Sequence, residues 1–153
     1  MNTTKPLRET RVGDAAVEGL LNGILAGIAM AAVIIGFGFL NGIAPLTVLQ
    51  YFDVTGNGSP LTGILVHLAV AGVYGVAFGL IAFVLARLLG ARMNRVGWLA
   101  LGAVYGAVIL GIAQGVILPR AALALEALPF WTMAAAHIVY GLVLAGLQMR
   151  GRV

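Results

Sequence analysis

Two histidines are the residues of this 153-residue chain with the clearest capacity for chemistry. His67 and His137 are its only histidines, and each lies about two turns inside an apolar stretch of membrane-spanning length. A ligating or ionisable side chain at that depth is rare, and by default it marks a functional site. Imidazole can bind haem iron or carry protons. The pair therefore defines the candidate site.

Both histidines belong to a set of four long apolar segments. Hydrophobic residues make up 61% of the chain and charged residues 9%, whereas a soluble domain carries about a quarter charged residues. A bilayer core needs about 20 helical residues. The sequence thus predicts an all-α, up-down-up-down four-helix transmembrane bundle forming a single domain over residues 15–149. Its spans are expected at about 15–43, 61–89, 96–118 and 129–149.

The basic residues predict the orientation of the bundle, because cytoplasmic loops are enriched in lysine and arginine. Eight of the nine basic residues flank one side, and only Arg120 lies on the other. The eight are Lys5, Arg8, Arg11, Arg87, Arg92, Arg95, Arg150 and Arg152. The tails at 1–14 and 150–153 are therefore expected in the cytoplasm, with the protein in a bacterial inner membrane. Interfacial aromatic belts are expected at Trp98 on the inner side and at Tyr51, Phe52 and Trp131 on the outer side.

Small residues spaced four apart predict how the helices pack, because close backbone approach drives helix association in a bilayer. The two halves of the chain also resemble each other faintly, which suggests a duplication. Each segment carries one series of small residues. The series are Gly19, Gly23, Gly27 and Ala31; His67, Ala71, Gly75 and Gly79; Ala103, Ala107, Gly111 and Gly115, with Gly102 and Gly106 beside them; and His137, Gly141 and Ala145.

The two histidines are expected at the same depth on helices that lie diagonally across the bundle. Counted from Pro60 and Pro129, both rings lie about 10–12 Å along their helices, at 1.5 Å per residue. Gln114 falls at nearly the same level. The sequence thus predicts a polar cluster of His67, His137 and Gln114, with Thr132 at its rim.

Three roles are open for this cluster. His67 and His137 could hold a b-type haem, with glycines making room for the macrocycle, or one histidine could hold a chlorophyll-type pigment. A proton-coupled transporter could combine the histidines with Asp14 and Glu18 near the inner end of the first span. The histidines could also be interhelical hydrogen bonders without further chemistry.

Several function classes are excluded or disfavoured by composition and motif. The chain has no cysteine, which excludes disulfides and thiolate metal sites. Its scattered basic residues form no face for nucleic acid. No metalloprotease, phosphate-loop or nucleophile-elbow motif is present. We therefore expect no enzyme, no catalytic residue and no metal site.

The segment Ala136-His137-Ile138-Val139-Tyr140-Gly141, together with His67, resembles a loose set of small four-span bacterial membrane proteins. The resemblance covers the layout of most of the chain but only a handful of motif residues. It implies the topology and the pairing of the histidines, and it brings no activity. The expected function is a non-enzymatic accessory or packing subunit, whose partners are the lipid bilayer and other membrane subunits or further copies of itself.

Overall fold

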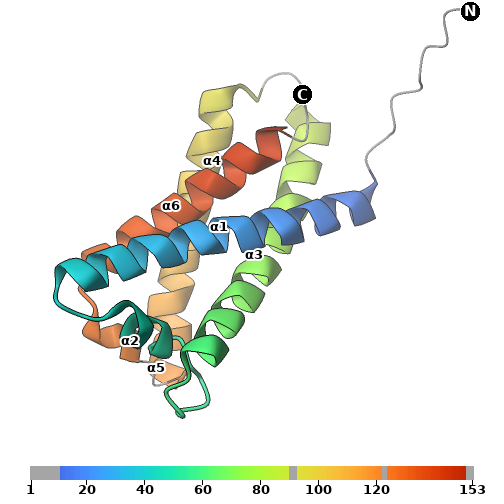
Figure 1. Ribbon diagram of the computed structural model, residues 1–153. Coiled ribbons are helices and arrows are strands. Elements are labelled where there is room, and N and C mark those ends of the chain that lie inside the picture. The colour runs from blue at the N-terminus through green and yellow to red at the C-terminus, as the bar shows by residue number, and fades with distance from the viewer. Residues whose placement is uncertain (1–10, 90–92, 122–123, 151–153) are drawn as a thin grey trace, which may run out of the picture.

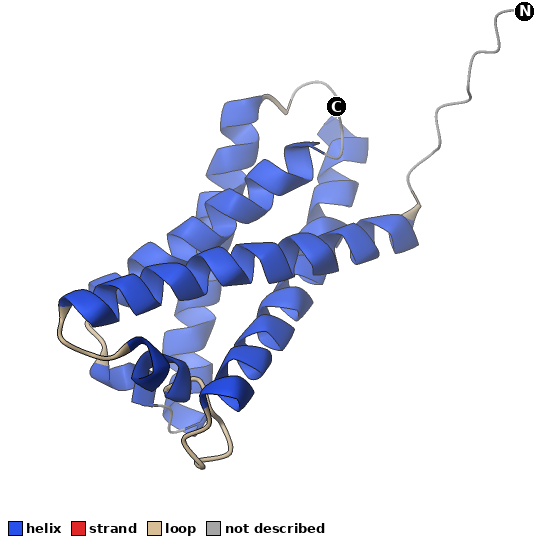
Figure 2. Ribbon diagram, viewed as in Figure 1, coloured by secondary structure: helices blue, strands red, loops and turns tan. Residues whose placement is uncertain are grey.

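The computed structural model describes residues 11–89, 93–121 and 124–150, and these residues form helices joined by short loops (Figures 1 and 2). Within them, four helices are long and apolar enough to cross a membrane. The long helices are α1 (Val12–Leu40), α3 (Pro60–Leu89), α4 (Arg95–Ile112) with its continuation, and α6 (Phe130–Arg150). The short elements are α2 (Pro45–Gln50), the π-helix η2 (Ala113–Ile117), α5 (Leu118–Ala121) and the 3-10 helix η3 (Ala124–Ala127).

The predicted four-helix transmembrane bundle is thus confirmed. The helix that was expected at 15–43 begins and ends three residues earlier, and the other long helices begin within one residue of the expected positions. Most of the predicted tails, 1–14 and 150–153, lies outside the described residues, as do Arg92 and the side chain of Arg120. The start of α1 and the end of α6 lie toward the same end of the bundle (Figure 1). The sequence predicts this end to be cytoplasmic, and it is called the inner end; the opposite end is called the outer end.

The bundle consists of two tightly packed helix pairs, α1 with α3 and α4 with α6. The pairs join along α1 and α6, which lie side by side in Figure 1. No comparable packing of described residues joins α3 to α4. The pseudo-symmetry suggested by the sequence would make the α3–α4 contact equivalent to the α1–α6 contact. The bundle is therefore closed on one side and looser on the other.

Glycines bring the backbones of each pair into direct contact. A Cβ atom placed on Gly19 would lie 2.5 Å from the carbonyl oxygen of Gly75, and one on Gly79 would lie 2.5 Å from that of Ala15. In the second pair, a Cβ on Gly141 would overlap the carbonyl oxygen of Gly102. Such close approach increases van der Waals contact, which holds helices together in lipid.

The small-residue series of the third span does not all face its partner. Gly102 and Gly106 are buried against α6, whereas Ala107, Gly111 and Gly115 are exposed. No atom lies within 4 Å of a Cβ placed on Gly111 or Gly115. The expectation that Ala107, Gly111 and Gly115 lie on the packing face was wrong, because Gly102 and Gly106 beside them allow a closer approach to α6.

Two tyrosines connect the helix pairs across the bundle. The Tyr140 hydroxyl of α6 donates to the carbonyl oxygen of Ala71 at 2.7 Å, and the Tyr105 hydroxyl of α4 donates to that of Tyr74 at 2.6 Å. Both acceptors are on α3. The glycine that follows each tyrosine packs within its own pair. The Tyr-Gly dipeptides of α4 and α6 thus serve both kinds of contact, one within a pair and one between pairs.

The outer loop between α1 and α3 folds inward as a cap. Val48 and Phe52 are buried, and a Cβ on Gly63 of α3 would overlap the carbonyl oxygen of Leu49. The expectation of an interfacial position for Phe52 was wrong, because its ring packs against His67 with centroids 4.6 Å apart. The connection between α5 and α6 also contributes to the core, since Leu125 is buried.

Asp53 holds the last part of this loop in shape. Its carboxylate accepts hydrogen bonds from the Thr55 hydroxyl at 2.7 Å and from the amide groups of Thr55 and Ser59, each at 2.9 Å. These bonds, led by the one from the Thr55 hydroxyl, lower the pKa of Asp53 below its usual value. Gly56 and Gly58 have φ angles of 73° and 65°, which L side chains rarely adopt, so the turn before α3 needs glycine at both positions.

Polar and aromatic residues near the inner end also face the interior. The Asn22 side-chain amide donates to Gln148 Oε1 at 3.4 Å, which links α1 to α6. Trp98 is buried rather than placed in an interfacial belt, because it packs in the core cluster between the helices. Trp131, by contrast, is half exposed at the outer end.

Candidate functional site

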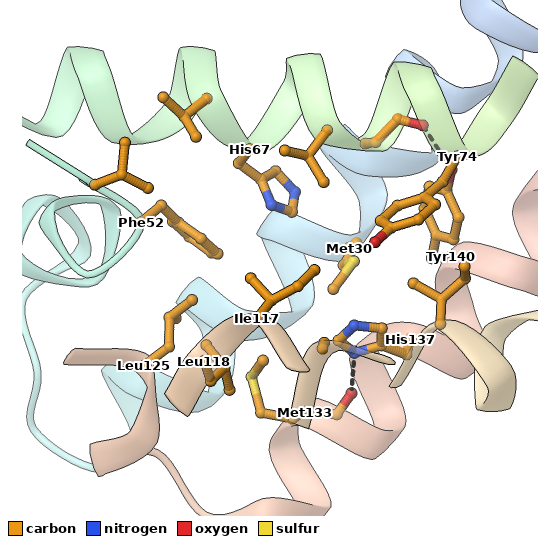
Figure 3. A pocket seen from close by; sticks show the side chains of 16 residues that line it. Met30, Phe52, His67, Tyr74, Ile117, Leu118, Leu125, Met133, His137 and Tyr140 are labelled. Carbon is orange, nitrogen blue, oxygen red and sulfur yellow. Dashed lines mark hydrogen bonds between the residues drawn. The ribbon is translucent and has the colours of Figure 1, made fainter. Parts of the chain in front are cut away.

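His67 and His137 line one cavity in the outer half of the bundle, where they face the same space from α3 and α6 (Figure 3). The cavity has a volume of about 130 Å³, and its other walls are almost entirely apolar. The remaining lining residues are Met30, Phe52, Val54, Val66, Val70, Ala71, Tyr74, Ile109, Ala113, Ile117, Leu118, Leu125, Met133 and Tyr140.

The His67 ring is fixed by a bond to the backbone of α1. Its Nε2 atom lies 3.0 Å from the carbonyl oxygen of Gly27. A carbonyl oxygen only accepts hydrogen bonds, so Nε2 must carry the proton and Nδ1 must hold a lone pair. Nδ1 has no hydrogen-bond partner among the described residues, yet it is not sealed from open space. His67 therefore offers the cavity one free acceptor.

The His137 ring is fixed in the opposite tautomer. Its Nδ1 atom lies 2.7 Å from the carbonyl oxygen of Met133, one turn earlier in α6 (Figure 3). Nδ1 must therefore donate, which leaves the lone pair on Nε2. Only 3% of the residue is exposed. Nε2 has no hydrogen-bond partner among the described residues, but the atom is not completely buried. The cavity is the open space next to it, so His137 provides a second free acceptor.

Tyr74 adds a third polar group. Its ring enters the cavity from α3 beside Met30 (Figure 3). Unlike the hydroxyls of Tyr105 and Tyr140, the Tyr74 hydroxyl makes no hydrogen bond to any described residue. It can donate to a bound molecule and accept from it.

The π-helix η2 forms the wall of the cavity opposite α3. Ala113 and Ile117 line the cavity from this segment, where a wider turn interrupts the α-helical ladder. Such turns occur frequently at functional sites. Val70 of α3 also lines the cavity and is 44% exposed. The cavity therefore opens near Val70, on a helix that is long and apolar enough to cross a membrane.

The remaining members of the predicted cluster do not line the cavity. Gln114 lies in η2 between two lining residues, but it is not itself part of the wall. Thr132 is buried outside the cavity, and its Oγ1 atom has no hydrogen-bond partner in the part of the chain that the structure describes. The structure thus brings His67 and His137 together and leaves Gln114 and Thr132 outside. The additional residue in a π-helical turn shifts which side chains face the bundle, and no sequence period reveals this.

The carboxylates of the first span lie far from the histidines. Asp14 accepts a hydrogen bond from the Arg11 amide at 3.2 Å in the first turn of α1. Glu18 lies one turn further along, still near the inner end, and neither residue lines the cavity. Within the described part of the chain, no group of three or more His, Cys, Asp or Glu residues could hold a metal ion.

The size of the cavity limits the ligands that it can take. A cavity of about 150 Å³ holds a single benzene ring, whereas sites for drug-sized ligands measure about 300–1,000 Å³. At about 130 Å³, the cavity matches one ring better than a macrocycle. The glycines were expected to make room for haem. The space beside Gly23 of α1 and Gly106 of α4 is instead filled by the backbone of the neighbouring helix.

Sequence reasoning missed Tyr74, Phe52 and the two methionines as members of the site. One signal for Tyr74 was available, because it is one of three tyrosines followed by glycine in the last three spans. The other two, Tyr105 and Tyr140, donate hydrogen bonds to backbone carbonyl oxygens of α3, the helix that carries Tyr74. No such signal marks Met30 or Met133, which have the same type of side chain as any packing residue.

Comparison of the chain with known protein families, curated proteins and solved structures finds no match. The resemblance to small four-span bacterial proteins therefore stays a prediction. The cavity, its two histidine acceptors and the Tyr74 hydroxyl are the basis for a functional argument.

Proposed function

We propose that this integral membrane protein is a non-enzymatic binding protein for a small aromatic compound that carries hydroxyl groups and enters from the bilayer. A phenol or a hydroquinone ring has the expected chemistry. The observation that supports this most directly is the pair of histidine lone pairs, at His67 Nδ1 and His137 Nε2, facing one apolar cavity.

The polar groups favour a ligand that donates hydrogen bonds. Each histidine has its proton engaged by a backbone carbonyl, at Gly27 or Met133, so each can only accept from a ligand while neutral. A hydrogen bond contributes about 0.5–1.5 kcal/mol when both partners would otherwise be hydrated. In an apolar cavity, no water competes for the histidine acceptors. A ligand with a hydroxyl group therefore binds more tightly than one of the same shape without it.

The apolar walls favour an aromatic ring. Met30 and Met133 line the cavity together with Phe52, and a methionine sulfur gains about 0.3–1.5 kcal/mol beside an aromatic ring. The lipid-facing opening near Val70 allows a compound dissolved in the membrane to enter without crossing the polar loops.

Binding of phenol, hydroquinone and toluene to the protein in lipid nanodiscs tests this proposal. We expect phenol and hydroquinone to bind at least fivefold more tightly than toluene, because one hydrogen bond of about 1 kcal/mol corresponds to that ratio. His137→Phe keeps a ring in place but removes one of the two acceptors, so it should lower the preference, while the acceptor at His67 remains. Titration calorimetry measures the three affinities.

Tyr105→Phe is the matched control, since its hydroxyl is already engaged with the Tyr74 carbonyl oxygen and does not line the cavity. This variant should keep the preference for hydroxylated rings. Equal binding of toluene and phenol to the unaltered protein would refute the proposal. A Soret band in the purified protein would instead favour the b-type haem.

A second role, as an accessory subunit of a larger membrane assembly, is supported by the exposed side of α4, which faces away from the bundle. Ala107, Gly111 and Gly115 are exposed there, with open space above both glycines. Small residues on a lipid-facing surface permit the close approach of another helix. Gly111→Leu should therefore release a co-purifying subunit or dissociate an oligomer, as size-exclusion chromatography would detect. An unchanged elution profile would count against this role.

A further inference from the structure

A second open space lies between α4 and α6 at the opposite end of the bundle from the histidines. This groove measures about 670 Å³ and lies where α4 begins and α6 ends. Arg95 and Arg150 line it at these two helix ends. The groove shares no residue with the histidine cavity, so it is a separate candidate site.

The charge of the groove is positive. Arg95 and Arg150 are exposed, and neither forms an ion pair or a hydrogen bond with any described residue. Among the described residues, no aspartate or glutamate lines the groove. Arginine presents a planar fork of donors that matches phosphate oxygens in pairs. Two free guanidinium groups at one mouth therefore favour an anion such as a phosphodiester.

The walls of the groove away from the arginines are apolar. Leu99 lines it from α4, and Val143 and Leu147 line it from α6. Gly146 lies between them, and a Cβ placed on it would meet nothing within 4 Å. The missing side chain leaves an open channel next to the leucines. The apolar side chains around this space suit a hydrocarbon chain.

We propose that the α4–α6 groove binds an anionic phospholipid, with the headgroup phosphate between Arg95 and Arg150 and an acyl chain along Gly146. Charge complementarity favours the anionic headgroup, and the apolar walls favour a lipid over a water-soluble anion. Basic pockets between transmembrane helices are a recurrent form of anionic lipid site on the cytoplasmic side. This is the side on which the sequence predicts both arginines.

Native mass spectrometry of the protein, after exchange into mixed phosphatidylglycerol and phosphatidylcholine, tests the proposal. We expect phosphatidylglycerol to be retained in preference to phosphatidylcholine. An arginine near an anionic lipid surface contributes about fivefold in affinity. The double variant Arg95→Gln and Arg150→Gln should therefore lower the retention of phosphatidylglycerol roughly 30-fold.

Arg87→Gln is the control for the loss of one charge, and it is compared with the single variant Arg95→Gln. Its guanidinium lies over the Phe83 ring, 4.5 Å from the centroid, and does not line the groove. This variant should retain phosphatidylglycerol like the unaltered protein. An equal loss in the Arg87 variant would overturn the proposal, since it would show that net charge rather than the groove selects the lipid.

Gly146→Leu tests the acyl channel while both arginines stay in place. A Cβ placed on Gly146 meets nothing within 4 Å, so the helix should fold and the larger leucine side chain should fill the open space. Retention of phosphatidylglycerol is expected to fall at least fivefold. Unchanged retention would overturn the acyl position. Displacement of the lipid by inorganic phosphate alone, at millimolar concentration, would overturn the lipid as the occupant.

Discussion

Replacing Gly141 with alanine is expected to lower the free energy of unfolding by about 3 kcal/mol. The added methyl group would overlap the carbonyl oxygen of Gly102, and it would also lie 3.0 Å from the Gly106 amide nitrogen. Overpacking costs about 1–3 kcal/mol where neighbouring side chains can move aside. Here the neighbours are backbone atoms, so α4 and α6 must separate along much of their contact. Unfolding in mixed micelles measures the loss.

Gly146→Ala is the matched control on the same helix. Its new methyl group would meet nothing within 4 Å. Alanine is favoured over glycine in a helix by up to about 1 kcal/mol, so this variant should be as stable as the original protein or slightly more so. Equal destabilisation by the two substitutions would show that helix propensity, rather than the contact between Gly141 and Gly102, determines stability.

Replacing Phe78 with alanine is expected to destabilise the protein by roughly 2 kcal/mol. Phe78 is fully buried, and its ring packs against Tyr105 with centroids 5.1 Å apart. This contact connects α3 to α4, where the two helix pairs have little other packing. Because the unfolded helices remain in lipid, the loss comes from packing rather than from transfer to water. The estimate therefore lies below the usual range for a soluble core.

Phe39→Ala removes the same side chain from a position that is 65% exposed. Its ring has lipid as a neighbour in the folded and unfolded states, so the change in unfolding free energy should be below about 0.5 kcal/mol. A comparable loss at Phe39 and Phe78 would contradict the view that the α3–α4 contact depends on specific packing. The same measurement as for Gly141 distinguishes the two outcomes.

The sequence by itself determined the number of spans and the kind of protein. A charged fraction of 9% cannot cover a water-facing surface, and segments of about 20 apolar residues have few alternatives to a transmembrane helix. Pro60 opens α3 as expected, because proline lacks only an N–H that has no helical partner at that position. The depth of His67 and His137 followed from the same helical geometry.

Tertiary structure alone decided which faces meet. The third span carries two small-residue series on neighbouring faces, and only the partner helix selects Gly102 and Gly106 over Gly111 and Gly115. It also decided the site. Both histidines bond to backbone carbonyls, and since every residue has one, no sequence pattern identifies the acceptor. The cavity lies between two helix pairs that join along α1 and α6 and pack little between α3 and α4, an asymmetry that two similar halves of sequence do not encode.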